Sequence, residues 1–526
     1  MADRTQVIIV GGGPVGVGLG IELGMRGVRC TVVERRTELQ HIPKGQGLSQ
    51  RSLEHFHFWG IEDELRAART LPKGYPIEGV TAYGNLMSEY WYQPPGRGSI
   101  RPFYYVANER LPQYETEKVL RAKVATLPSV RVLMGRTVRA VEQDAGGVRV
   151  TVESAEWPYD EEVLEAEYVV GCDGAHSLIR EKTGIKRRGA DFDQKMALVV
   201  FRSKAFHEAL ERFPHSTTYR AMDPALQGYW MFFGRVDVGQ EFFFHAPVPL
   251  DAQADTYDFQ LLLNKAAGFE FEAEFLHKGF WDLKVAVADE YQKGRVIIAG
   301  DAAHSHPPYG GFGLNNGLED VVNLGWKLTA VLEGWGSQAL LDSYGEERRP
   351  IFWETGQDFI TRWIEQDRDF LNTYSPQKDE NEFARQWKAQ GETTHLAVYE
   401  PHYEGSSVLW GPEGGVCSAH GSHTFTARAG HHLPPASLSD GKGVHEAFGP
   451  WFTLLALDAT DAEVASFEQA ANAERVPLKV VRDSVKGGRE GYEARLILVR
   501  PDQYVAWLGD AAPADAASVL RRTVGR

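Results

Sequence analysis

Two glycine-centred segments that lie far apart in the chain carry the residue types that bind a nucleotide. The first is GGGPVG at residues 11–16, in which Gly11, Gly13 and Gly16 form the pattern G-x-G-x-x-G after an apolar strand. Such glycines permit a tight turn and let backbone N–H groups approach a pyrophosphate at the N-terminus of the following helix. The next apolar strand ends in Glu34, a carboxylate that can accept hydrogen bonds from ribose hydroxyls. This order of elements predicts a dinucleotide site.

The second segment, residues 295–304, is an apolar strand that runs into Gly300 and Asp301. A fold that brings the two segments together would contact a bound nucleotide at two separate places. For Asp301 a helix N-cap is the structural alternative. A further apolar strand, 168–171, leads to Asp173, for which an Asx-type turn is the alternative.

The composition of the chain argues against several other classes of function. The 526 residues carry a formal net charge of −16 and show no run of Lys and Arg, which argues against a nucleic-acid partner. The sequence lacks the H-E-x-x-H, G-x-S-x-G and P-loop patterns of metal hydrolysis, serine acyl transfer and phosphoryl transfer. Its three cysteines are widely spaced, so they predict neither a zinc site nor a disulfide framework, and no metal ligand is predicted.

The sequence also indicates where the protein works. No apolar run reaches the roughly eighteen residues that span a bilayer, so no membrane partner is expected. The first strand begins by Val7, which leaves no room for a signal or transit peptide. We therefore expect a cytoplasmic protein whose chemistry is redox chemistry on a bound cofactor.

Hydrophobic periodicity divides the chain into successive parts. Residues 1–180 and 286–372 are expected to form an α/β nucleotide-binding domain, which a sheet-rich domain at 181–285 interrupts. A linker is expected at 373–425, and a separate small α/β domain at 426–526.

Individual elements follow from apolar spacing and from helix stop signals. Helices are expected at 44–59, 113–127, 315–333 and 340–370. The sheet-rich domain is expected to have few helices between its strands, which are placed at 196–202, 228–234 and 241–247. The C-terminal domain is expected to contain a strand, helix, strand, helix, hairpin and last helix.

Three motifs in this order resemble those of the single-component FAD-dependent aromatic hydroxylases, the group A flavoprotein monooxygenases. They are the fingerprint at 11–16, an Asp-Gly motif at 172–180 and a Gly-Asp motif at 300–317. The tail resembles the phenol hydroxylase branch of that family through segments 452–455 and 498–507. The resemblance implies an α/β fold with a Rossmann-like FAD-binding domain, an inserted β-sheet substrate domain and a thioredoxin-like C-terminal domain. The tail lacks C-x-x-C and cannot exchange dithiols, so a structural role or the support of a homodimer is expected.

The resemblance also implies which residues contact FAD. Glu34 would bind the adenosine ribose and Asp301 the ribityl chain, while Leu314 and Asn315 would offer backbone N–H groups to the pyrimidine end of the flavin. Lys44 stands where arginine is usual in the family, and it keeps the positive charge without the bidentate fork. The full set of expected cofactor-binding residues is Gly11, Gly13, Pro14, Val15, Gly16, Glu34, Arg35, Lys44, Gln113, Asp173, Gly300, Asp301, Pro308, Gly311, Gly313, Leu314 and Asn315.

For catalysis, the family implies that NAD(P)H reduces FAD, that O₂ adds at the flavin C4a, and that the hydroperoxide transfers its distal oxygen to an aromatic ring, expected to be phenolic. Gln46 lies where phenol-hydroxylating relatives carry an acidic or histidine side chain, and glutamine cannot act as a base at neutral pH. The carbonyl of Pro308 would accept a hydrogen bond from the reacting hydroxyl. His306 and Tyr229 are further candidates, with a packed loop histidine and plain sheet core as their alternatives.

Two other hypotheses stay open at this point. A related flavoenzyme would use the same cofactor for epoxidation, Baeyer–Villiger insertion or dehalogenation of a small aromatic substrate. A flavin-binding NAD(P)H oxidase or redox sensor would bind FAD without hydroxylating anything; Gln46 favours it, whereas the intact Gly-Asp motif argues against it. Substrate-stimulated NAD(P)H consumption coupled to a hydroxylated product would separate these hypotheses.

Overall fold

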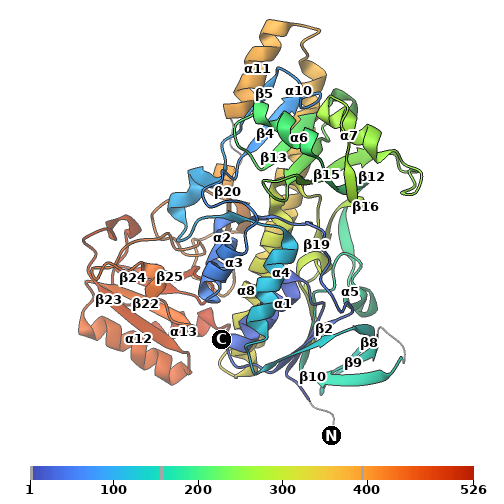
Figure 1. The fold of residues 1–526 in the computed structure, drawn as a ribbon. Coiled ribbons are helices and arrows are strands. Elements are labelled where there is room, and N and C mark those ends of the chain that lie inside the picture. Colours follow the sequence, from blue (N-terminus) through green and yellow to red (C-terminus); the bar gives the residue numbers. More distant parts are fainter. Residues whose placement is uncertain (1–3, 155–158, 393–395) are drawn as a thin grey trace.

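The computed structural model describes residues 4–154, 159–392 and 396–526. Figure 1 shows a six-stranded sheet in the lower part of the molecule, an eight-stranded sheet in the upper part and the C-terminal domain at one side. Long helices connect the lower and upper parts. Within the described ranges, none of the helices is long and apolar enough to cross a membrane.

The six-stranded sheet forms the nucleotide-binding part. Its four central strands, β18, β11, β1 and β2, are short apolar runs that are buried on both faces, as is typical of parallel sheets covered by helices. Because β1 pairs with β2 on one side and β11 on the other, the carboxyl ends of these strands meet at one edge, where helix α1 (Pro14–Met25) begins. The order is β17 (Gln292–Lys293), β18 (Val296–Ile298), β11 (Tyr168–Gly171), β1 (Val7–Val10), β2 (Cys30–Glu34) and β7 (Val130–Met134).

An antiparallel three-stranded sheet lies beside the six-stranded one. It consists of β8 (Arg136–Asp144), β9 (Gly147–Ser154) and β10 (Glu161–Ala166). The helix expected at 113–127 is α4 (Gln113–Val124).

The eight-stranded sheet extends beyond the expected range 181–285. It also takes two short strands from before that range and one from after it, because β4 pairs with β13 in parallel and β19 pairs with β16. Two helices, α6 (Lys204–Ala209) and α7 (Phe259–Ala267), also lie between its strands, where few were expected. The order is β19 (His304–Ser305), β16 (Glu274–Ala288), β12 (Arg187–Arg202), β15 (Glu241–Val248), β14 (Met231–Arg235), β13 (Thr218–Met222), β4 (Gly79–Tyr83) and β5 (Trp91–Tyr92).

The helix expected at 44–59 begins later than its apolar pattern suggests. Helix α2 covers Gln50–Phe58, because the Ser49 side chain accepts the N–H of Ser52 and so caps it. The residues before it form β3 (Gly47–Leu48), which pairs with β6 (Glu109–Arg110).

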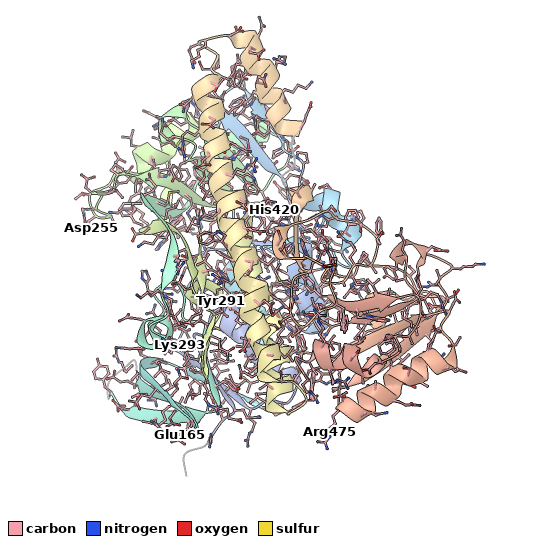
Figure 2. All side chains as sticks on the ribbon, turned by 180° about the vertical axis from the view of Figure 1, so that it is seen from behind. Glu165, Asp255, Tyr291, Lys293, His420 and Arg475 are labelled. Atoms are coloured by element: carbon pink, nitrogen blue, oxygen red, sulfur yellow. The ribbon has the colours of Figure 1, made fainter. Side chains whose placement is uncertain are left out.

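A helical run follows the Gly-Asp segment. Helix α8 (Phe312–Leu332) is followed by α9 (Gln338–Glu354), which continues through a π-helical turn (Thr355–Thr361) into α10 (Arg362–Thr373). Figure 2 shows this last run passing along the length of the molecule, from the lower sheet to the upper one.

The segment expected to be a linker, 373–425, contains regular structure. Helix α11 (Glu380–Glu392) buries Phe383 and Trp387, whose rings pack against Tyr83 and Tyr92 beside the eight-stranded sheet. Two strands, β20 (Tyr399–Tyr403) and β21 (Cys417–His420), pair with each other.

The C-terminal domain is a four-stranded sheet with two helices. Its order is β23 (Leu478–Asp483), β22 (Phe452–Leu457), β24 (Leu496–Val499) and β25 (Val505–Gly509), and α12 (Asp461–Glu474) connects the parallel pair β22 and β23. The second helix expected before the hairpin is only a short 3₁₀ turn (Glu490–Tyr492), and the last helix is α13 (Ala516–Thr523).

Candidate active site

A cavity of about 1420 Å³ is lined by the eight-stranded sheet and by the loops that follow strands β1, β11 and β18 of the six-stranded sheet. Its wall includes the start of α1, residues 42–47, the start of α8, and one face of the eight-stranded sheet. This volume exceeds the roughly 300–1,000 Å³ of most small-molecule sites. The cavity therefore has room for a large cofactor together with a substrate.

Helix α1 presents an uncapped N-terminus to this cavity. Its N-cap, Gly13, has extended backbone and no side-chain cap, and Gly13, Pro14 and Val15 all lie on the wall. A Cβ atom on Gly13 would meet nothing within 4 Å. Free N–H groups and the positive end of the helix dipole thus face open space, which is what a pyrophosphate requires.

The turn before α1 is held together by the neighbouring strands. Gly11 has φ +108°, and a Cβ atom there would lie 2.3 Å from the carbonyl oxygen of Cys172. The buried Glu34 carboxylate accepts the N–H of Gly12 over 2.7 Å and that of Arg36 over 2.9 Å. Glu34 therefore fixes the glycine turn, and its remaining lone pairs stay available to hydroxyl donors.

Helix α8 presents a second uncapped N-terminus. Its N-cap, Gly311, has φ +67° and no side-chain cap, and Gly311, Gly313 and Leu314 line the cavity. The Asn315 side chain instead donates to the carbonyl of Gly47 over 2.9 Å and ties α8 to the neighbouring segment. An uncapped helix start stabilises negative charge, so an anionic edge of a ligand is favoured at this end of the cavity.

Lys44 and Asp301 place opposite charges on the wall between the two helix starts. The Asp301 side chain is exposed to the cavity, and desolvation by the surrounding protein raises its pKa, while His304 and Lys44 act in the other direction. Burial and the nearby Arg36 lower the pKa of Lys44. A carboxylate and an ammonium group so placed suit the hydroxyl and phosphate groups of a nucleotide.

Gln46 and His306 are polar side chains on the wall, and each has hydrogen-bonding atoms without a partner. Gln46 is 7% exposed, and neither atom of its carboxamide has a partner among the residues that the structure describes. His306 bonds the carbonyl of Pro307 through Nδ1, while its Nε2 has no partner within the same residues. Burial lowers the pKa of His306 to about 4, so the ring is neutral and a weak base. Both side chains suit a polar ligand in the cavity.

Four further polar residues on the wall were not among the expected site residues, although one of them, Tyr309, lies within the Gly-Asp motif at 300–317. Arg110 donates to the carbonyl of Arg235 over 2.8 Å, but its second terminal nitrogen finds no partner in the described chain. Burial lowers the Arg110 pKa to about 9, so the guanidinium keeps its charge at neutral pH. Trp230 Nε1 and Tyr309 Oη also have no partner there, and Arg220 pairs with Asp367 over 3.1 Å.

The eight-stranded sheet and helix α10 supply an aromatic wall. In strand β15, Phe243 faces the cavity, whereas Phe242 and Phe244 belong to the core on the other face, as strand alternation requires. Other rings on the wall are those of Tyr92, Trp230, Phe232, Phe280, Trp281, Trp363, Phe370 and Tyr374.

The structure brings most of the expected site residues to one cavity. Those on the wall are Gly13, Pro14, Val15, Lys44, Gln46, Gln113, Asp301, His306, Pro308, Gly311, Gly313 and Leu314. Those off the wall support it from behind or lie beyond it: Gly11, Gly16, Glu34, Arg35, Asp173, Gly300, Asn315 and Tyr229. Asp173 accepts the N–H of Ile179 over 3.1 Å, and Tyr229 packs against the apolar cluster that contains Trp230. A catalytic role for Tyr229 stays a prediction.

Comparisons with protein families give two matches that together cover most of the chain. Residues 4–358 match a family described as an FAD binding domain. Residues 426–526 match the C-terminal region of aromatic-ring hydroxylases.

Individual proteins that are similar to this chain have descriptions consistent with these two families. A protein of Streptomyces coelicolor described as a polyketide hydroxylase is 32% identical over 69% of this chain, which spans only 58% of that relative's length. The FAD-dependent monooxygenase apdD of Emericella nidulans is 29% identical over 96% of this chain and 87% of its own. Among solved structures, RebC with bound 7-carboxy-K252c aligns over the whole of both chains with a TM-score of 0.86 and 28% identity.

Proposed function

Because the chain belongs to the family of FAD-binding aromatic-ring hydroxylases and is an FAD-dependent monooxygenase, we propose that it hydroxylates a multi-ring aromatic substrate with NAD(P)H and O₂. The observation that carries this proposal is one cavity with two uncapped helix starts at one end and a wall of aromatic rings at the other.

The residues at the helix starts fit FAD. The N–H groups of α1 would hold the pyrophosphate, Asp301 would accept hydrogen bonds from the ribityl hydroxyls, and the N–H groups at Gly313 and Leu314 would meet the pyrimidine edge. When bound, FAD supplies the redox chemistry that accepts electrons from a nicotinamide and passes one oxygen atom of O₂ to an electron-rich ring. The protein's tasks are to place the ring and to exclude water.

A planar multi-ring substrate matches the aromatic end of the cavity. Rings such as Phe243, Trp230 and Phe232 offer faces and edges on which further aromatic rings pack favourably. The relative described as a polyketide hydroxylase supports a substrate of this class.

The polar side chains would orient the reacting hydroxyl without a strong base. The Gln46 carboxamide can donate and accept, so it would hold a substrate hydroxyl but not remove its proton. His306 Nε2 would accept a hydrogen bond, because the neutral ring carries its proton on Nδ1, toward the Pro307 carbonyl. The unpaired nitrogen of Arg110 would lower the pKa of a nearby phenol by stabilising the phenolate.

The organisation of the chain is part of the same proposal. Residues 1–180 and 286–372 would bind FAD, and the eight-stranded sheet would hold the substrate. The C-terminal domain has a parallel β22 and β23 pair joined by α12, followed by antiparallel β24 and β25 and by α13, an arrangement that supports a thioredoxin-like domain. It has no paired cysteines, so its role would be structural. Membership of the phenol hydroxylase branch stays a prediction.

The substrate class can be tested with the purified, FAD-loaded protein. NADH or NADPH consumption is measured with single-ring phenols and with hydroxylated naphthalenes and anthraquinones at equal concentrations. We expect the multi-ring compounds to stimulate consumption at least about tenfold more than the single-ring phenols. Equal or stronger stimulation by single-ring phenols would overturn the multi-ring assignment.

A further inference from the structure

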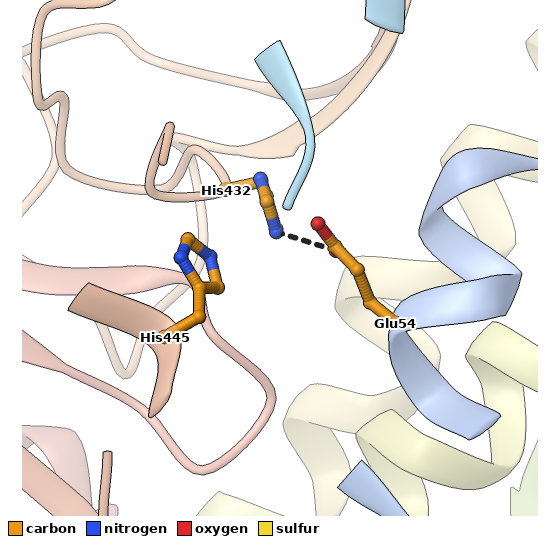
Figure 3. A group of neighbouring side chains, drawn as sticks. All are labelled: Glu54, His432 and His445. Carbon is orange, nitrogen blue, oxygen red and sulfur yellow. Dashed lines mark ion pairs between the residues drawn. The ribbon is translucent and has the colours of Figure 1, made fainter. Parts of the chain in front are cut away.

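Away from the cavity, a carboxylate and two imidazoles meet between the nucleotide-binding part and the C-terminal part. Glu54 comes from helix α2, His432 from the loop before the C-terminal sheet, and His445 from a short 3₁₀ helix (Val444–Ala447). One oxygen or nitrogen atom from each lies within 4.8 Å of those from the other two. Figure 3 shows the two rings and the carboxylate turned toward a shared space.

The two imidazoles are buried without the hydrogen bonds that burial demands. His445 is 1% exposed, and neither of its ring nitrogens has a partner among the residues that the structure describes. His432 Nε2 lies 2.8 Å from Glu54 Oε2, yet it lacks the directional geometry of a hydrogen bond. Each unsatisfied buried polar atom costs about 1–3 kcal/mol of folding free energy. A bound ligand that contacts these three nitrogens would explain why they have no partner in the protein.

The surroundings hold both rings in place. Tyr105 stacks on His445 at 5.3 Å between ring centroids, and Tyr104 stacks on His432 at 5.4 Å. The N–H of Tyr105 also donates to Glu54 over 2.7 Å, which orients the carboxylate. Outer contacts of this kind commonly orient the ligands of a metal ion.

The charged groups next to Glu54 also bear on whether a cation can bind. Arg51 lies 3.1 Å from Glu54 Oε2, the same oxygen that His432 Nε2 approaches. The Arg51 guanidinium is also paired with Glu319 over 2.9 Å, and Glu319 is shared with His55. Arg51 is the one guanidinium in the described part of the chain that contacts Glu54. Neither nitrogen of the His445 ring has a hydrogen-bond partner among the described residues, so the ring can offer a nitrogen lone pair to a metal. A second, small cavity of about 70 Å³ borders His432 and can hold water as a further ligand.

We propose that Glu54, His432 and His445 bind a divalent transition-metal ion, with zinc as the fitting example. Two imidazole nitrogens and one carboxylate oxygen are a ligand set that zinc accepts, with bonds of about 2.0–2.2 Å and a water completing the shell. The ion would link α2, which packs beside the cofactor cavity, to the C-terminal part of the chain. Its role would be structural, because no ligand lies on the wall of the large cavity.

The site predicts a particular response to the variant His445→Leu. In a metal-free protein, leucine would replace a ring with two unsatisfied nitrogens, and stability would stay the same or rise. If the site binds zinc, the variant instead loses a ligand and the stabilisation that the ion provides. The matched control is His420→Ala, because His420 belongs to an exposed group with Glu354 and Asp358 that would bind metal only adventitiously.

The experiment uses the full chain loaded with FAD. Each protein is incubated with ZnCl₂, passed through gel filtration, and analysed for zinc and flavin content, while thermal unfolding is followed with and without zinc. We expect about one zinc per wild-type chain, the same in His420→Ala, and at least about tenfold weaker zinc binding in His445→Leu. The zinc-dependent rise in melting temperature should vanish only in His445→Leu, with flavin content unchanged.

Other outcomes would overturn the site. Wild-type protein that retains no zinc, or His445→Leu that retains as much as wild type, would show that the three residues do not bind the ion. Loss of zinc in His420→Ala alone would assign it to the exposed group instead.

Discussion

Asp301 is the side chain whose removal should weaken cofactor retention most directly. Its carboxylate is exposed to the cavity and, among the described residues, forms no hydrogen bond that would cap the neighbouring turn, so it is free to accept hydrogen bonds from a ligand. We expect Asp301→Ala to lose most of its FAD on gel filtration, while Asp301→Asn, which keeps one hydrogen-bond acceptor, loses less. Full retention of FAD by Asp301→Ala, measured by absorbance against protein concentration, would contradict the assignment.

Titration of His306 should not contribute to the dependence of enzyme activity on pH near neutral pH. Its pKa lies at about 4, below the ordinary value near 6.5, because burial opposes the charged ring. We expect His306→Asn to change the rate by the same factor at pH 6 and pH 8. An acidic limb near pH 6 that disappears in the variant would show instead that His306 acts as a base.

The lowered pKa of His306 also makes the stability of the folded chain depend on pH. Between about pH 6.5 and 4 the unfolded chain binds a proton at His306 that the folded chain does not, so stability falls as the pH falls through this window. The fall should be shallower in His306→Asn, as measured by urea unfolding at several pH values.

At the residue scale, sequence motifs identified the cofactor end of the cavity far better than the substrate end. Gly13, Lys44 and Asp301 lie in segments whose spacing carries the signal, and all three reach the wall. Arg110 and Arg220 lie in strands that pair only in the folded chain, so no local pattern marks them. Glu54, His432 and His445 show the same limit, because their separation in the sequence hides their proximity.

At the scale of elements, the start of helix α1 offers a clean test of where the cofactor lies. Gly13 has φ −75°, which alanine adopts without strain, and its Cβ atom would point into open space. Gly13→Ala should therefore leave the apoprotein as stable as wild type, or slightly more stable. The methyl group would intrude where the pyrophosphate lies, so we expect the FAD dissociation constant to rise at least about tenfold, or about 1.4 kcal/mol.

The control for this prediction is Gly345→Ala in helix α9. A Cβ atom there would make an ordinary contact of 3.6 Å with Tyr291, away from the cavity. FAD titration of the two apoproteins should separate them. Equal affinities for FAD would mean that α1 does not face the cofactor.

Elements with strong local signals were predicted well, and those defined by distant partners were not. The strand, helix and strand around residues 7–34 follow from apolar runs and glycines, and they appear as β1, α1 and β2. Strands β4 and β5 are short, and β4 depends on pairing with β13 and β5 on pairing with β4, so their sequence alone did not assign them to the eight-stranded sheet. Helix α11 has only two buried aromatic anchors, and its polar composition led to the expectation of a linker.

At the scale of the whole molecule, a buried ion network joins the nucleotide-binding helices to the C-terminal domain. Glu347 on α9 contacts Arg500 over 2.7 Å and Lys327 on α8 over 2.7 Å, and all three side chains are fully buried. Arg500 also pairs with Asp502. Removing one partner of such a network leaves an uncompensated buried charge.

Glu347→Gln should therefore destabilise the chain by about 3–5 kcal/mol, because Lys327 and Arg500 lose their shared anion. Lys327→Met should cost less, since Glu347 keeps Arg500 as its partner. Arg500 and Lys327 hold the pKa of Glu347 well below its usual range, so its contribution is present above about pH 4.3 and is lost as the pH falls. Chemical unfolding of wild type and both variants from pH 7 to pH 2 checks this, and a larger loss in Lys327→Met at pH 7 would contradict the account.

The central claim is that one cavity places a multi-ring aromatic substrate against FAD for hydroxylation. Its most direct test is turnover of the FAD-loaded protein with NAD(P)H, a hydroxylated multi-ring substrate and ¹⁸O₂, followed by mass spectrometry of the product. The account predicts substrate-stimulated NAD(P)H consumption and a product that gains one ¹⁸O atom from O₂. NAD(P)H consumption matched by H₂O₂ across the whole substrate panel, with no labelled product, would contradict it.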